Sequence, residues 1–183
     1  MLGCLFFLIG GIEMNVSGIN YESIVDGEGV RVVLYVSGCA HHCKGCHNPS
    51  TWDANSGKPF TEEIQNSIYE ACKPEYIEGL TLSGGCPMCN ATELIPFVKS
   101  FKKKFPDKTI WCYCGETVEE ISKEPRTDKY RLLSLVDVLV DGQFVLEKKN
   151  PNLAFRGSSN QRIIKVTNIA DNVFCADVTH PHD

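Results

Sequence analysis

The sequence predicts an α/β fold whose sheet is mainly parallel. Short runs of β-branched and aromatic residues alternate with segments whose apolar residues recur at helical spacing, and this alternation is typical of βαβ units. A length of 183 residues suits one domain, and 43% hydrophobic with 22% charged residues is ordinary for a globular protein. Because no repeat or low-complexity linker divides the chain, we expect a single domain over residues 14–183 with a C-terminal tail.

The first thirteen residues are expected to be an N-terminal extension. Residues 2–12 are apolar but too short to span a bilayer, and no Lys or Arg precedes them as in a signal peptide. Met14 then opens an ordinary N-terminus. An ordered, strand-like arm is the alternative, and both interpretations are favoured over a membrane anchor.

Local signals place the elements along the chain. Thr61 is suited to cap a helix whose first turn is acidic, and Thr117 and Glu120 have capping-box spacing. Pro96 is tolerated only near the first turn of its helix. The expected strands are 30–36, 79–82, 109–114, 136–142 and 162–166, and the expected helices start at 61, at about 92 and at 117.

The charge of the chain argues against nucleic-acid binding. The net charge is -5, which opposes recognition through phosphate neutralisation. One basic cluster, 102–104, lies on an expected helix and is typical of a solvated face. We therefore expect neither a nucleic-acid partner nor a membrane partner.

Ten cysteines are many for this length, and their grouping indicates metal chemistry. Cys4, Cys72 and Cys175 stand alone, whereas the others are closely spaced. Grouped cysteines without a secretory signal are typical of metal sites in a reducing compartment, so we expect a cytoplasmic protein. The groups are Cys39, Cys43 and Cys46; Cys86 and Cys89; and Cys112 and Cys114.

The first group forms a C-x3-C-x2-C loop directly after the expected strand 30–36. Three thiolates can hold three corners of a 4Fe-4S cluster and leave one iron open, and thiolates suit iron–sulfur clusters and zinc. The alternative is a zinc site completed by His41, His42 or His47. The spacing alone leaves both interpretations open.

The unusual sequences of the chain all follow the ends of expected strands. In parallel α/β architectures these carboxyl ends face one side, where ligands bind. The sequences are therefore expected to meet in space. They are the cysteine loop and the segments 83–87, 112–115 and 140–144.

Six segments together resemble one family. The cysteine loop after a strand is similar to the cluster motif of radical S-adenosylmethionine enzymes. The whole set most closely resembles the activating proteins of anaerobic ribonucleoside-triphosphate reductase, which are glycyl-radical-enzyme activases. The segments run in the expected order over nearly the whole chain, from about Met14 to Val166. They are 24–31, 37–48, 82–85, 111–115, 138–144 and 156–162.

The resemblance implies a partial, open (β/α) barrel of the radical S-adenosylmethionine type and an oxidoreductase. In such enzymes a reduced 4Fe-4S cluster cleaves S-adenosylmethionine to methionine and a 5′-deoxyadenosyl radical, so the cofactors carry the chemistry. The radical would abstract a hydrogen from a glycine of the partner, the glycyl-radical subunit of the reductase. The electron donor would be a protein such as flavodoxin or ferredoxin.

The resemblance also assigns site residues. Cys39, Cys43 and Cys46 would bind the cluster, and no catalytic residue is expected beyond the cluster and the cofactor. Gly84 and Gly85 would let the backbone approach the methionyl amine, because glycine lacks Cβ; a flexible turn is the alternative. The residues implied to contact S-adenosylmethionine are Gly45, Cys46, His47, Gly84 and Gly85.

Two further segments and one residue each allow two interpretations. Segment 26–29 is either a turn or part of the region near the active site and the partner. Asp141 is a turn acid or a site residue. Segment 156–162 is most simply a surface loop, and the alternative is a partner-recognition or pocket-closing segment.

The sequence departs from the family pattern at two cysteines. Cys86 stands where Asp or Glu usually follows the two glycines, and Cys114 stands where Thr is usual. A backbone contact to S-adenosylmethionine does not depend on the side chain at Cys86, whereas any role of the acidic side chain would be lost. A second thiol site, holding a metal or a redox pair, is one interpretation, and reduced, partly buried thiols are the ordinary one. Its members would be Cys86, Cys89, Cys112 and Cys114.

Two other functions remain as alternatives. One is an activase of a different glycyl-radical enzyme, such as pyruvate formate-lyase. The other is a noncatalytic zinc-binding adaptor built on the cysteine loop and a histidine. The short chain and the segments 138–144 and 156–162 favour the reductase as partner.

Overall fold

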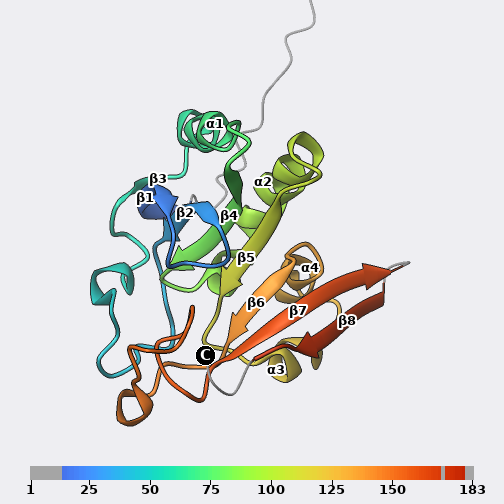
Figure 1. Ribbon diagram of the computed structural model, residues 1–183. Coiled ribbons are helices and arrows are strands. Elements are labelled where there is room, and N and C mark those ends of the chain that lie inside the picture. The colour runs from blue at the N-terminus through green and yellow to red at the C-terminus, as the bar shows by residue number, and fades with distance from the viewer. Residues whose placement is uncertain (1–13, 170–171, 180–183) are drawn as a thin grey trace, which may run out of the picture.

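The computed structural model describes residues 14–169 and 172–179 and has one eight-stranded sheet (Figure 1). The strand order is β3-β1-β2-β4-β5-β6-β7-β8, so β3 and β8 are the edges of an open sheet. The central strands β2, β4, β5 and β6 are parallel, whereas the outer pairings are antiparallel. The strands are β1 (Asn15–Ser23), β2 (Val30–Val36), β3 (Lys58–Pro59), β4 (Ile77–Gly84), β5 (Thr109–Tyr113), β6 (Val138–Asp141), β7 (Arg162–Ile169) and β8 (Asn172–Asp177).

The mainly parallel sheet expected from the sequence is therefore confirmed for its centre only. The run 30–36 is a strand over its full predicted length, but β1 precedes it and pairs with it antiparallel. The predicted strand 162–166 is present and longer, and it runs antiparallel to β6. The prediction for residues 1–13 lies outside the described residues.

Four α-helices accompany the described strands, and their caps follow the sequence signals. The Thr61 side chain accepts from Ile64 N at 3.4 Å, and Thr117 with Glu120 forms the predicted capping box. Pro96 lies inside its helix, beyond the first turn in which we expected it. None of the helices in the described ranges has the length and apolar character to cross a membrane. The helices are α1 (Glu62–Ala71), α2 (Ala91–Lys104), α3 (Val118–Ser122) and α4 (Asp128–Leu133), with 3-10 turns η1 (Pro49–Thr51), η2 (Pro87–Asn90) and η3 (Leu146–Lys148).

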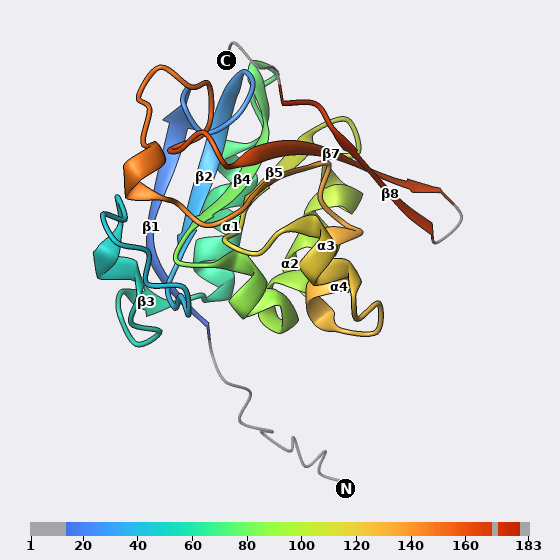
Figure 2. The same cartoon turned by 90° about the horizontal axis from the view of Figure 1, so that it is seen from below.

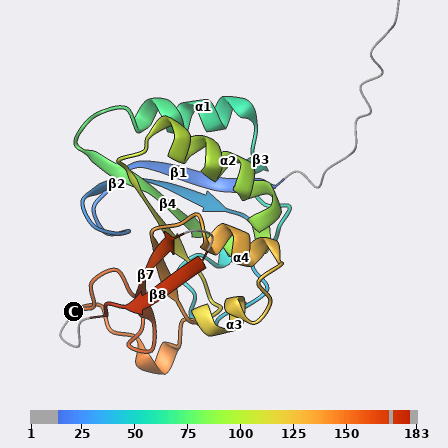
Figure 3. The same ribbon diagram turned by 90° about the vertical axis from the view of Figure 1, so that its right-hand side faces the viewer.

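The helices gather on one side of the sheet, and the segment after β6 lies on the other (Figure 2). α1 and α2 run side by side over β1, β2 and β4, and α4 packs beside α2 (Figure 3). Fully buried Leu34, Leu82 and Leu139 form the main core with α2 residues such as Leu94 and Phe101. This core fixes the central strands, and with them the position of their carboxyl ends.

The opposite face of the sheet holds a buried cation, Arg31, which is 1% exposed. Burial lowers its pKa from 12.5 to about 10, so it stays charged at neutral pH. Its guanidinium lies over the Trp111 ring, 5.7 Å from the centroid. It donates five hydrogen bonds of 2.7–3.1 Å, two to Thr109 and one each to Glu28 O, Leu80 O and Thr81 Oγ1.

The basic cluster 102–104 forms the last turn of α2. Lys102 Nζ donates to Asp137 Oδ1 at 2.9 Å and to Leu135 O at 3.1 Å. Lys104 Nζ lies 4.7 Å from the centroid of the Tyr69 ring. Two of the three charges therefore contact this chain, and they also suit the negative end of the helix dipole.

Candidate functional site: a cysteine-lined cavity at the strand ends

The carboxyl ends of the parallel strands meet at one cavity of about 230 Å³. Its lining comes from the cysteine loop, from the turns after β4, β5 and β6, and from segment 156–162. The convergence expected from the strand-end positions is therefore observed. Cys39, Cys43, Cys46, Gly84 and Gly85 all line this cavity.

The cysteine loop is anchored at its base. Gly38 N donates to Thr51 O at 2.8 Å, and Cys39 N donates to Trp52 O at 3.1 Å. Between these bonds the loop has little regular structure, and the three thiols are free and half-buried. The sheet thus holds the two ends of the loop, while its cysteines face the cavity.

The three thiols of the loop suit a positively charged group. Burial raises the pKa of Cys43, and repulsion from Cys39 and Cys46 raises it further, while a backbone hydrogen bond from Phe144 opposes the shift. A bound cation reverses this balance, because a coordinating thiol is deprotonated. Asn48 N also donates to Cys46 Sγ at 3.4 Å. The donor set therefore fits an iron–sulfur cluster, which prefers thiolates.

The histidines of the loop have contacts of their own. His42 packs against Trp52 with ring centroids 4.9 Å apart, and His47 packs against Phe144 at 5.5 Å. The His41 ring lies beside Cys86, with Nε2 3.7 Å from Sγ. In the described part of the chain, the one group whose ligand atoms lie within 4.8 Å of one another contains none of the three loop cysteines. This arrangement does not favour a zinc ion held by the loop cysteines and a histidine.

Gly84 and Gly85 are required by close backbone packing. Gly84 has a φ of +97°, and a Cβ there would lie 2.6 Å from Val36 O. A Cβ on Gly85 would lie 2.5 Å from Gly38 O. Gly85 N donates to Val36 O and Cys86 N to Gly38 O, both at 2.8 Å. The turn after β4 is thus clamped to the end of β2, which contradicts the flexible-turn alternative.

Gly45 and His47 flank the last cysteine of the loop. Gly45 has a φ of +77°, and a Cβ there would lie 2.8 Å from the Leu146 side chain. The glycine therefore lets η3 approach the loop. His47 is exposed and lines the cavity.

The structure brings Cys86 and Cys114 of the predicted second site together, with Cys89 beside Cys86, and places Cys112 in the core. Cys86 and Cys114 are 1% and 5% exposed, with sulfurs 3.8 Å apart. Cys112 is fully buried in the main core, and burial raises its pKa well above 9. Cys89 is exposed and lines a different cavity. Glu116, which the sequence analysis missed, lies beside the close pair.

Segment 156–162 is not the exposed surface loop that was the simplest prediction. Ser158 is fully buried, and Gly157 and Gln161 line the cavity. Gln161 Oε1 accepts from Gly157 N at 2.9 Å, and Gln161 Nε2 donates to Gly142 O at 3.0 Å. The segment therefore closes one wall of the cavity. Asp26, from the predicted segment 26–29, lines it as well.

Asp141 is a buried structural acid. It accepts from Val118 N at 2.8 Å and from Arg162 at 2.6 and 3.0 Å. Arg162 also binds Glu119, and these hydrogen bonds lower the pKa of Glu119 to about 2. Asp141 thus joins β6, β7 and the start of α3, and its side chain acts in the fold.

Comparisons with known proteins identify the family. A family model described as a 4Fe-4S single cluster domain matches residues 25–164. The anaerobic ribonucleoside-triphosphate reductase-activating protein of Pasteurella multocida is 43% identical over 148 residues, covering 79% of this chain and 92% of the relative. The chain belongs to this family of activating proteins. Its members in Escherichia coli K12 (40% identity; 75% of this chain, 90% of the relative) and in phage T4 (40%; 79% and 92%) are also similar.

The part of the chain that the family model matches includes the cavity and its walls. The matched residues 25–164 include the cysteine loop, the two glycines after β4 and segment 156–162. The iron–sulfur interpretation of the loop is thereby supported, since the matched model describes a domain with a single 4Fe-4S cluster.

Proposed function

We propose that this protein activates an anaerobic ribonucleoside-triphosphate reductase by generating a glycyl radical in it. Cys39, Cys43 and Cys46 would hold a 4Fe-4S cluster. When bound, the cluster would supply the electron for cleavage of S-adenosylmethionine to methionine and a 5′-deoxyadenosyl radical, and this radical would take a hydrogen atom from a glycine of the reductase. The observation that carries the proposal is the single cavity lined by all three thiols and by the Gly84–Gly85 turn.

In this proposal the residues of the chain bind the cluster and orient S-adenosylmethionine. Three cysteine ligands leave one iron open for S-adenosylmethionine. Cys46, His47, Gly84 and Gly85 line the cavity and would contact the cofactor there, whereas Gly45 is not among its lining residues and would act by letting η3 approach the loop. Because the turn after β4 is clamped to the end of β2, the sheet would fix the position of the Gly84–Gly85 turn relative to the start of the cysteine loop.

Cys86 alters one part of the site. A carboxylate in its place would accept a hydrogen bond from a cofactor amine, and a thiol is a weak acceptor. The pKa of Cys86 is raised to about 12, first by its hydrogen bond with Cys114, so it is neutral when no metal is bound. Binding of the amine therefore relies on backbone groups of the Gly84–Gly85 turn.

The reductase glycine would approach from a neighbouring cavity. A neighbouring cavity of about 430 Å³ shares Asp26, His47, Tyr113 and Gly157 with the cysteine-lined one. Its rim carries Ile24 and Val25, which are 73% and 70% exposed, an unusual position for aliphatic side chains. We assign this rim to the glycine-bearing segment of the reductase.

The remaining features of the proposal concern fold, compartment and electron supply. We regard residues 14–183 as one domain, and the open sheet with helices on one side as a partial (β/α) barrel of the radical S-adenosylmethionine type. Nine described cysteines are free, which suits a reducing cytoplasm. The electron would come from a flavodoxin or a ferredoxin, because the chain itself supplies none.

The test is electron paramagnetic resonance on the anaerobic mixture of this protein, its reductase, S-adenosylmethionine and a reductant. We expect a glycyl radical that depends on S-adenosylmethionine, and its loss together with bound iron in Cys39→Ala, Cys43→Ala and Cys46→Ala. These variants should keep the circular dichroism of the parent, because the core packing lies elsewhere. A radical that persists in all three variants would contradict the proposal. Replacing the reductase by pyruvate formate-lyase tests the alternative partner.

A further inference from the structure

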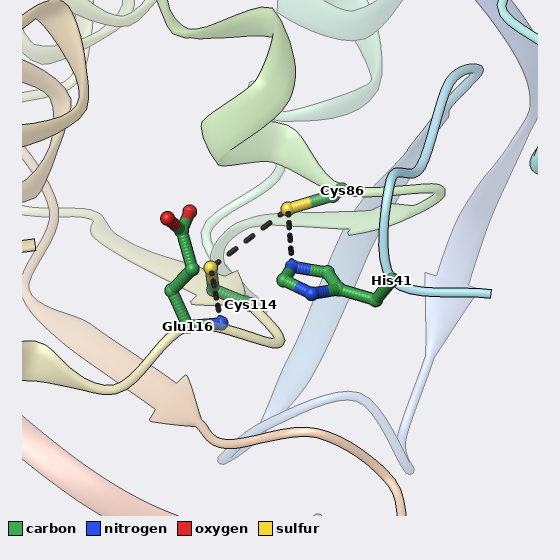
Figure 4. Close-up of side chains that lie close together, drawn as sticks. All are labelled: His41, Cys86, Cys114 and Glu116. Atoms are coloured by element: carbon green, nitrogen blue, oxygen red, sulfur yellow. Dashed lines mark hydrogen bonds between the residues drawn. The ribbon is translucent and has the colours of Figure 1, made fainter. Parts of the chain in front are cut away.

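We propose that His41, Cys86, Cys114 and Glu116 form a zinc site separate from the cluster loop cysteines. The four residues come from three segments: the cysteine loop, the turn after β4 and the turn after β5. Their ligand atoms all lie within 4.8 Å of one another. The close-up shows the two sulfurs and the imidazole turned toward one another, with Glu116 beside them (Figure 4).

The distances match those of tetrahedral zinc. Zn–S bonds of about 2.3 Å at a tetrahedral angle put two thiolate sulfurs about 3.8 Å apart, and a Zn–N bond of about 2.0–2.1 Å puts nitrogen about 3.6 Å from sulfur. The observed separations are 3.8 Å between the sulfurs of Cys86 and Cys114, and 3.7 Å from Cys86 Sγ to His41 Nε2. Two edges of the coordination tetrahedron are therefore already in place.

Neighbouring groups hold the imidazole in position. A Cβ on Gly115 would lie 2.5 Å from His41 Cδ2, so the ring packs directly on this glycine. His41 Nδ1 lies 3.2 Å from Gln143 Nε2. A 180° rotation of the Gln143 amide would bring Oε1 to this place, where it would accept from Nδ1–H and leave the Nε2 lone pair for the metal, the usual second contact of a zinc-bound histidine.

The surrounding charges balance the site. Two thiolates and the Glu116 carboxylate carry three negative charges, and zinc supplies two positive ones. Lys129 Nζ contacts both Glu116 oxygens at 2.7 and 2.8 Å and supplies the remaining positive charge. Glu116 N donates to Cys114 Sγ at 3.2 Å, a contact that a zinc-bound thiolate can accept. The ion and these groups together are thus neutral, which suits a site whose two thiols are buried and whose histidine and carboxylate are partly buried.

The other two thiols of the predicted second site are excluded from this donor set. Cys112 is fully buried in the core on the helix side of the sheet. Cys89 hydrogen-bonds to Cys86 but is exposed and outside the group of close ligand atoms. The site therefore combines two thiols with a histidine and a carboxylate, where the sequence had suggested four thiols.

The test measures zinc in protein whose cluster ligands have been removed. The Cys39→Ala/Cys43→Ala/Cys46→Ala variant cannot trap zinc in the cluster loop, so we expect about one zinc ion per chain in it by elemental analysis. X-ray absorption at the zinc edge should report two sulfurs and two nitrogen or oxygen ligands. Adding Cys86→Ser or Cys114→Ser should abolish the bound zinc, and Gln143→Ala should lower zinc affinity by about 10–100-fold.

Matched controls distinguish the donor set. Cys89→Ser and Cys175→Ser in the same background should keep the zinc. Loss of zinc in Cys89→Ser would overturn the proposed set of ligands, and a zinc-free protein that gives no thiolate charge-transfer band with Co²⁺ would overturn the site. Mass spectrometry that detects a Cys86–Cys114 disulfide in anaerobically purified protein would also overturn the zinc site. It would show that the two thiols form a redox pair. These readouts do not depend on glycyl-radical formation, so they stand whether or not the proposed function fails.

Discussion

Replacing Gly85 by Ala should disturb the junction between the sheet and the cysteine loop. The backbone of Gly85 is not in the left-handed region, so the substitution adds no conformational strain. Its Cβ, however, would lie 2.5 Å from Gly38 O, where ordinary contacts begin at 3.4 Å. The two backbones must therefore separate by about 0.9 Å. Forcing extra volume into a packed site costs about 1–3 kcal/mol of unfolding free energy.

The same backbone displacement would also move Cys39, a proposed ligand of the cluster. Gly38 directly precedes Cys39, and a misplacement of about 1 Å at a reacting group can lower a rate about 100-fold. We expect Gly85→Ala to lose about 1–3 kcal/mol in urea unfolding of the cluster-free protein. After cluster reconstitution it should cleave S-adenosylmethionine about 100-fold more slowly.

A matched control exists on β1. A Cβ on Gly18 would meet nothing within 4 Å, so Gly18→Ala should be neutral or slightly stabilising. If Gly85→Ala were as stable and as active as Gly18→Ala, the reasoning from backbone contact would be refuted.

Three other perturbations have defined outcomes. Arg31→Met leaves several buried oxygen acceptors without a donor, and urea unfolding should show a loss of about 3–5 kcal/mol; a loss below about 1 kcal/mol would mean that water replaces the guanidinium. Pairing with Arg162 lowers the Glu119 pKa from 4.5 to about 2, so the pair stabilises the fold above pH 4.5 and loses this effect as pH falls toward 2. Because Glu119 is 62% exposed, Glu119→Gln should cost less than about 1 kcal/mol at pH 7 and clearly less than that at pH 2, and an equal cost at both pH values would contradict this. Ile24→Ser/Val25→Ser should keep S-adenosylmethionine cleavage but lower the glycyl-radical yield about tenfold, since apolar contact with the reductase is lost; an unchanged yield would remove the rim from the docking surface.

The central strands could be predicted because burial on both faces of the sheet selects apolar residues along their whole length. A parallel strand covered on both faces is a nearly continuous apolar run, and residues 30–36 form such a run except for Arg31. The outer strand β1 carries polar residues on both faces and a glycine, so it lacks a periodic signal. Helix α4 has six residues, too few for a helical period to be recognised.

The direction of β7 required an argument that strand patterns do not contain. Parallel neighbours need a crossover, usually through a helix, and the 142–161 connection contains only the short turn η3. β7 therefore runs antiparallel to β6, and segment 156–162, which precedes it, lies along the cavity. Positions after strand ends could be predicted to converge, whereas the contact of Glu116 with Cys114 depends on how the turn after β5 folds back.

The hydrogen bonds that close the cysteine loop at its base bear on what loss of a cluster would do to the fold. Gly38 and Cys39 are bonded to Thr51 and Trp52 by backbone groups alone, so this closure does not depend on any metal. Loss of a cluster would release the three thiols and leave the sheet and the loop ends where they are. A new cluster would then assemble on a loop whose two ends are already held together.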